Sequence, residues 1–170
     1  HKAEFVEVLE PALAKVLARR PDQVEIRIIG DFPRLSHLDP DHPAVRIIPP
    51  IWDFEAFCAE LAGADINLSV LFRSVITDAK SEIKWMEAAM LGLPSVVSPT
   101  ATHQEVIEDG VTAMLAEDQA AFVAAILRLV DDADLRHRIG GAARAAVLRD
   151  YGLPAMGARF AAMFDAVRPP

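Results

Sequence analysis

The residues with the clearest potential for chemistry lie between positions 80 and 87. Lys80, Ser81 and Lys84 bring two positive charges and a hydroxyl group to the predicted start of a helix. The free backbone N–H groups and the dipole of a helix N-terminus favour an anion at that place. Glu87 lies three residues after Lys84 and so near the same helix face, where its carboxylate could accept hydrogen bonds from two ribose hydroxyls. The pattern indicates a phosphate site with a ribose contact behind it, which together describe a nucleotide.

A second interpretation needs no ligand. In it, residues 80–87 form the solvated start of a helix, and Lys84 pairs with Glu82 or Glu87 at the spacing of ordinary surface pairs. The spacing of these side chains is compatible with either interpretation.

The elements that must position this stretch are alternating helices and strands. Apolar residues recur at three- and four-residue steps in some segments and form short continuous runs in others, which favour helices and buried strands respectively. The pattern predicts strands at 24–29, 45–48, 65–71, 95–98 and 111–115, and helices at 2–20, 53–62, 81–91, 120–130, 133–149 and 155–167, with a further short helix that begins at Thr102. This order is typical of the α/β class: a Rossmann-like parallel sheet of five or six strands with helices on both faces.

Several local signals place the ends of these elements. Asp53, Ser81 and Thr102 are each expected to cap the N-terminus of a helix, Thr102 in a capping box with Glu105. Gly92 fits the position just after a helix C-terminus. In open parallel sheets, ligands bind outside the carboxyl ends of the strands. The loop at 72–80, which leads into the charged stretch, is therefore a candidate binding loop.

Composition excludes several classes of protein. The 170 residues suit one domain, 1–170, and 17 basic against 25 acidic residues give a net charge of -8, so no basic face for nucleic acid is expected. Cys58 is the only cysteine, which excludes an internal disulfide, and His37, His42 and His137 lack the spacing of metal ligands. The sequence shows no apolar run long enough to span a membrane and no secretory signal, so a cytoplasmic location is expected.

Two segments carry a resemblance to a known family. Residues 87–98, EAAMLGLPSVVS, and 104–115, QEVIEDGVTAML, resemble consecutive signature segments of the retaining glycosyltransferases with the GT-B fold, the large group 1 (family 4-like). Residues 20–31 resemble the helix-strand-glycine entry of the same family. The similarity extends from about residue 4 to residue 146, and its segments occur in the family's order.

The resemblance implies a domain that binds a nucleotide-diphosphate sugar, the donor substrate, with no other cofactor and no metal. In the family this is the C-terminal half of a two-domain enzyme, and the sugar is transferred in the cleft between the halves. In the family, the N-terminal acceptor domain is followed by a strand, a glycine-containing turn and then this first helix. That domain is absent from this chain, which is therefore expected to be a fragment that is inactive alone. A peripheral membrane association of the full-length enzyme is a further option.

The resemblance can be carried over to single residues. Glu87 matches the second glutamate of the family's Glu-x7-Glu pattern, which contacts the donor ribose. The first glutamate falls on Ala79, and the family's Gly-Phe-Gly is replaced by Lys80-Ser81-Glu82, so the sugar contacts would have to come from Asp78 or Glu82. A subset of the family has Lys-Ser-x-x-Lys here.

In that subset, Lys80, Ser81 and Lys84 would hold the diphosphate and neutralise charge as the leaving group forms. Thr102 follows the fourth predicted strand, where the family often contacts the donor, although a capping role also accounts for it. No catalytic residue is assigned in this half.

Two rival functions belong to other classes. A GT-B-like sugar-nucleotide epimerase shares the architecture and would isomerise a sugar nucleotide without an acceptor. A non-catalytic nucleotide-binding α/β module is the second rival, and it rests on the replacement of the first motif glutamate by Ala79.

Overall fold

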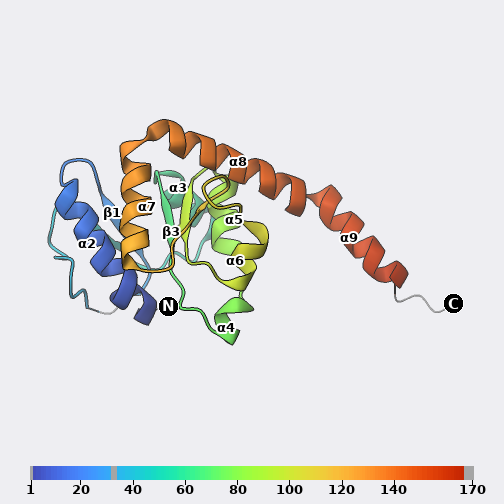
Figure 1. Cartoon of the computed structure of the whole chain (residues 1–170), viewed down its shortest axis with the longest axis horizontal. Coiled ribbons are helices and arrows are strands. Elements are labelled where there is room, and N and C mark those ends of the chain that lie inside the picture. Colours follow the sequence, from blue (N-terminus) through green and yellow to red (C-terminus); the bar gives the residue numbers. More distant parts are fainter. Residues whose placement is uncertain (1, 32–33, 167–170) are drawn as a thin grey trace.

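The computed structural model describes residues 2–31 and 34–166. Within them the chain forms parallel strands that alternate with helices (Figure 1). The strands are β1 (Ile26–Ile29), β2 (Val45–Ile48), β3 (Asn67–Ser69), β4 (Ser95–Val97) and β5 (Met114–Leu115). The helices are α1 (Lys2–Glu4), the π-helical segment η1 (Phe5–Leu9), α2 (Glu10–Arg19), α3 (Phe54–Ala62), α4 (Val75–Asp78), α5 (Ile83–Met90), α6 (Ala101–Val106), α7 (Gln119–Asp131), α8 (Ala133–Tyr151) and α9 (Leu153–Ala166). The predicted α/β class is confirmed.

Both faces of the strands are covered by helices, as the continuous apolar runs predict. Neighbouring residues of β4 point to opposite faces. Val96 packs into a core with apolar side chains of α2 and α7, whereas Val97 packs into a second core with side chains of α5 and α8. The second core fixes α5 and its charged N-terminal turn against the sheet.

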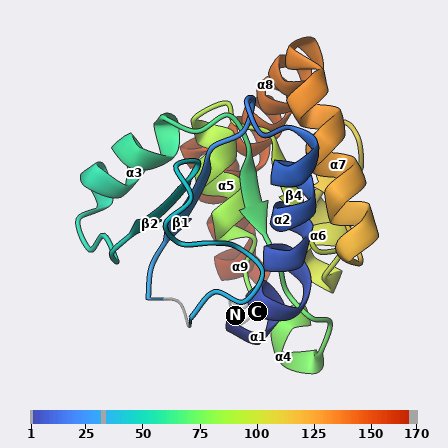
Figure 2. The ribbon, with the colours of Figure 1, turned by 90° about the vertical axis from the view of Figure 1, so that its left-hand side faces the viewer.

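The strands do not form one continuous sheet in the described residues. β1 pairs with β2, and β3, β4 and β5 form a separate three-stranded group. In Figure 2, β1 lies between β2 and the other group. Apolar side chains of β1 and β4 share one core with α2, so packing joins the groups where hydrogen bonding does not. The expectation of a single sheet of five or six strands is wrong on this point.

Some predicted ends differ because backbone groups find partners outside the ladders. The strand predicted at 65–71 shortens to β3, since the Leu71 N–H donates to Ser98 Oγ at 2.9 Å. The helix α4 was not predicted, and it is started by a reciprocal capping box between Ser74 and Thr77. The predicted end of α9 at Val167 lies outside the described residues. In the described part, no helix is both long and apolar enough to cross a bilayer.

The predicted helix ends are partly confirmed. Asp53 caps α3 by accepting from the Ala56 N–H at 2.8 Å. Gly92 follows α5 with a φ of +75°, a left-handed conformation that glycine adopts without strain. The capping roles of Ser81 and Thr102 are wrong. Glu82 and Thr100 hold those positions instead.

Candidate functional site

The candidate site lies where β3 and β4 end and where α5 and α6 begin. The loop after β3 crosses to α6 and is fastened there by Asp78. One carboxylate oxygen of Asp78 accepts from the Ala101 N–H at 2.8 Å, and its carbonyl oxygen accepts from the Thr102 hydroxyl at 2.9 Å. These bonds bring the predicted binding loop and two helix N-termini together at the carboxyl edge of the strands, the usual place for a ligand in this architecture.

Lys80, Lys84 and Glu87 share one electrostatic environment, as the spacing predicts. The pKa of Lys84 lies below its usual value because protein surrounds its ammonium group and because Lys80 adds a like charge, although the residue as a whole is exposed. Glu87 and Glu4 act in the opposite direction on Lys84. Burial also raises the pKa of Glu87, and Lys84 offsets part of that rise. A bound anion would stabilise the charged form of Lys84, so the cluster is suited to phosphate.

Glu4 belongs to this cluster, and sequence reasoning missed it. It lies in α1, far from α5 in the sequence, yet its charge acts on Lys84. Within the described residues, no ion pair joins Lys84 to Glu82 or Glu87, so the surface pairing of the second interpretation is not formed.

Ser81 and Glu82 take different positions from those the sequence predicts. Helix α5 begins two residues later than expected, and the carbonyl oxygen of Glu82 accepts its first hydrogen bonds, from Trp85 and Met86. Ser81 is left exposed beside the lysines and is not the cap. The carboxylate of Glu82 accepts a short hydrogen bond from the hydroxyl of Tyr151, the last residue of α8.

Thr102 is a tether between α6 and the loop. Its hydroxyl donates to the Asp78 carbonyl, and the cap of α6 is Thr100, which accepts from the His103 N–H at 3.3 Å. The capping box with Glu105 does not form because the helix starts one residue before Thr102. Asp78 is a candidate for the missing sugar contact. Its Oδ1 accepts a hydrogen bond from the Ala101 N–H and lies 3.7 Å from Nε of Arg73.

His103 is a buried residue of the site that sequence reasoning placed in a capping box. Its Nδ1 lies 2.7 Å from the carbonyl oxygen of Ser98, so Nδ1 donates and the neutral ring carries its proton there. Burial lowers the pKa of His103 below its ordinary value, and the Ser98 carbonyl and the charge of Glu82 partly offset this.

We expect His103 to make the domain less stable in mild acid. Because its pKa is lowered in the folded chain, the unfolded chain binds the proton first, and stability falls as pH drops below the ordinary value of 6.5. Thermal unfolding at about pH 7.5 and about pH 5.5 measures the effect. His103→Asn keeps a donor for Ser98 and should lose less stability over this interval than wild type. His137→Asn, at an exposed position, should lose as much as wild type; equal losses in all three proteins would contradict the assignment.

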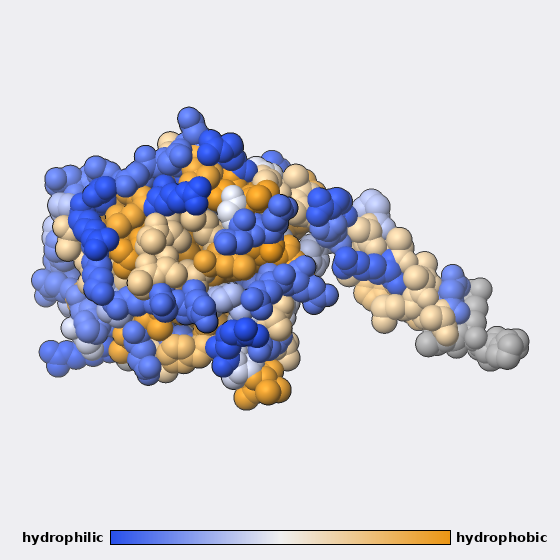
Figure 3. Space-filling model, in the orientation of Figure 1, coloured by the Kyte–Doolittle hydropathy of each residue, from blue (hydrophilic) through white to orange (hydrophobic). Residues whose placement is uncertain are grey.

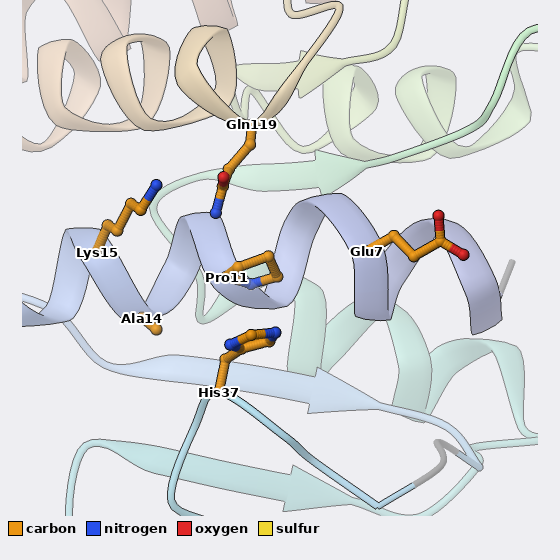
Figure 4. A pocket seen from close by; sticks show the side chains of 6 residues that line it. All are labelled: Glu7, Pro11, Ala14, Lys15, His37 and Gln119. Carbon is orange, nitrogen blue, oxygen red and sulfur yellow. The ribbon is translucent and has the colours of Figure 1, made fainter.

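Two hollows in the described surface lie away from these residues. One, of about 430 Å³, is lined by Glu7, Pro11, Ala14, Lys15, His37 and Gln119 (Figure 4). The other, of about 590 Å³, is lined by residues 21–25 and 42–44. Neither includes a predicted site residue. In the described part of the chain, no group of three or more His, Cys, Asp and Glu side chains is arranged to hold a metal ion.

Comparison with known proteins connects this geometry to a family. The family described as "Glycosyl transferases group 1" matches residues 2–132, which is most of the chain. The chain belongs to the group 1 glycosyltransferases. The match contains the whole of the candidate site, from Glu4 to Thr102. A search of curated protein sequences gives no match.

Solved structures share the fold of this glycosyltransferase domain. The C-terminal domain of the group 1 protein LpcC from Francisella tularensis superposes with a TM-score of 0.67 at 16% identity, covering 90% of this chain and 82% of that one. HepE from Anabaena, solved with UDP and glucose, gives 0.65 at 18% identity over 92% of this chain and 44% of that one. A putative UDP-N-acetylglucosamine 2-epimerase from Listeria monocytogenes gives 0.61 at 20% identity, over 95% and 41%. This chain therefore spans less than half of the HepE and epimerase chains.

Proposed function

We propose that this glycosyltransferase domain binds a nucleotide-diphosphate sugar and that the full-length enzyme transfers the sugar to an acceptor with retention of configuration. The grouping of Lys80, Lys84 and Glu87 at the carboxyl edge of the strands carries the proposal. The lysines neutralise the diphosphate, with the exposed Ser81 hydroxyl beside them, and Glu87 accepts from the ribose. As the diphosphate leaves, its growing negative charge is stabilised by the same lysines. A cytoplasmic location belongs to this proposal.

The proposal includes a second domain that precedes this one and binds the acceptor. The share of the HepE chain that this chain spans, 44%, supports it. So does the division of the strands into two groups, because one further parallel strand between β1 and β3 would join them into a single sheet. A peripheral association with a membrane would belong to that full-length enzyme.

Helix α9 also supports a second domain. No residue of α9 is buried in this domain, and the helix projects away from the body (Figure 1). Its large apolar side chains stand at helical spacing and are exposed: Leu153 at 89%, Phe160 at 54%, Met163 at 64% and Phe164 at 67%. Figure 3 shows apolar side chains along the projecting helix. We propose that the preceding half of the same enzyme covers this stripe, because uncovered stripes of this kind mark interaction surfaces.

Thermal unfolding of the full-length protein with UDP, GDP, ADP, dTDP and CDP tests the donor site. A nucleotide at a hundredfold excess over its dissociation constant adds about 2.7 kcal/mol. For a unit the size of the donor domain, the midpoint of its unfolding should then rise by roughly 5–10 °C with one base and by less with the others. No rise with any of the five would overturn the proposed donor site. The same panel on the isolated domain shows whether the site is complete without the other half.

The Listeria neighbour gives one reason to measure a second activity. An epimerase would isomerise a sugar nucleotide without any acceptor, whereas a transferase needs the acceptor for turnover. Following the sugar nucleotide by NMR, with and without a lysate fraction as acceptor source, separates the two. We expect the sugar configuration to stay unchanged in the absence of acceptor.

A further inference from the structure

Helix α8 lies along α5 and contacts it at both ends. At one end, Gly140 of α8 sits so close to the turn after α5 that an added Cβ would lie 1.9 Å from the carbonyl oxygen of Gly92. Between the ends, Trp85 and Ala89 of α5 pack in one core with side chains of α8. At the other end, the hydroxyl of Tyr151 donates to the carboxylate of Glu82, just before α5 begins. Helix α8 thus supports the helix that carries Lys84 and Glu87.

The two sides of the α5 N-terminal turn differ in charge. Lys80, Glu87 and Glu4 influence the pKa of Lys84. Glu82 acts on Tyr151 and on His103. Burial raises the pKa of the Tyr151 hydroxyl, and the hydrogen bond to Glu82 raises it further. At neutral pH the hydroxyl is therefore protonated and acts as the hydrogen-bond donor to Glu82. The Glu82 carboxylate is therefore held on the α8 side of α5 by this hydrogen bond.

Tyr151 itself is fixed from the other side. The guanidinium carbon of Arg159, in α9, lies 5.8 Å from the centre of the Tyr151 ring, within the range of a cation–π contact. Between them, Gly152 has no room for a side chain, because a Cβ would lie 2.3 Å from the carbonyl oxygen of Leu148. The tight junction of α8 and α9 therefore holds the tyrosine ring beside Glu82.

We propose that Tyr151 is a positioning residue of the donor site, whose hydroxyl holds the Glu82 carboxylate on the α8 side of α5 and away from the diphosphate. The inference rests on the proposed function. Without this hydrogen bond, the Glu82 side chain can rotate toward the lysines, where its negative charge repels the phosphates and competes for the ammonium groups. Tyr151 thus protects the positive character of the turn without touching the donor.

The test uses the full-length protein and the nucleoside diphosphate that gives the largest thermal shift. Tyr151→Phe keeps the ring and its contact with Arg159 but removes the hydroxyl. We expect its dissociation constant, measured by calorimetry, to rise about five- to tenfold. The matched control is Arg149→Gln, which removes two exposed hydrogen bonds to Asp150 at the same end of α8 and should bind as wild type does.

The double variant separates positioning from a general loss of structure. If Tyr151 acts through the Glu82 charge, adding Tyr151→Phe to Glu82→Gln changes the dissociation constant of Glu82→Gln by less than about twofold. Equal binding by wild type and Tyr151→Phe would overturn the inference and leave the proposed function in place. The same holds if Tyr151→Phe raises the dissociation constant of Glu82→Gln by as large a factor as it raises that of wild type. Wild-type protein that binds none of the five nucleotides overturns both.

Discussion

Lys84→Ala in the full-length enzyme is expected to lower the rate of sugar transfer about 10²–10³-fold, the cost of removing one preorganised group that stabilises charge in a transition state. Lys84 stands in the first turn of α5, its ammonium group crowded by protein and by the charge of Lys80. Both influences disfavour its charge in the free protein, so a diphosphate gains more from this lysine than from a fully solvated one. Binding of the nucleoside diphosphate should weaken as well.

The rate of donor consumption with saturating acceptor and the dissociation constant of the nucleotide are the two measurements. Lys15→Ala is a matched control, since Lys15 is an exposed lysine of α2 that lines a hollow away from the site. It should leave both values unchanged. If Lys84→Ala kept its rate and affinity within twofold of wild type while Lys15→Ala did the same, the phosphate role of Lys84 would be excluded.

The sequence predicts which site residues lie together within one helix, but not which residues reach the site from elements distant in sequence. The grouping of Lys84 and Glu87 was predictable, because residues three apart in a helix share a face whatever the rest of the chain does, and Lys80 lies in the loop that leads into this helix. Glu4 and Tyr151 were not, because each reaches α5 from an element far away in sequence, and neither has a local pattern. The same holds for Glu10, whose buried carboxylate accepts from the backbone N–H groups of Ser36, His37 and Leu38 at 2.5–3.1 Å.

The fold was predictable to a similar extent. Buried runs and helical spacing indicated the strands and the long helices, whereas α4 was missed because one turn is too short for periodicity to show. The caps at Ser81 and Thr102 were misplaced because a hydroxyl near a helix start satisfies the local pattern at several neighbouring positions. Thr100 and Glu82 were chosen by the contacts of Asp78 and Tyr151, which only the folded chain provides.

Gly140→Ala is expected to destabilise the domain by at least about 3 kcal/mol, at the upper end for overpacking in a core. A methyl group at this position would meet the backbone of Gly92, at 1.9 Å from its oxygen and 2.7 Å from its carbon, and backbone cannot turn aside as a side chain can. Helices α5 and α8 must then separate. For a unit of this size the midpoint of thermal unfolding should fall by roughly 6–12 °C.

The neighbouring glycine provides the control for this change. Gly141 is exposed, and an added Cβ would have no heavy atom within 4 Å, so Gly141→Ala should gain about 1 kcal/mol from helix propensity alone. Equal stability of the two variants would show that α8 does not need this close approach. Because the same helix brings Tyr151 to Glu82, Gly140→Ala protein that stays folded should also bind nucleoside diphosphate more weakly than Gly141→Ala. The packing of α8 on α5 is then a condition of donor binding as well as of stability.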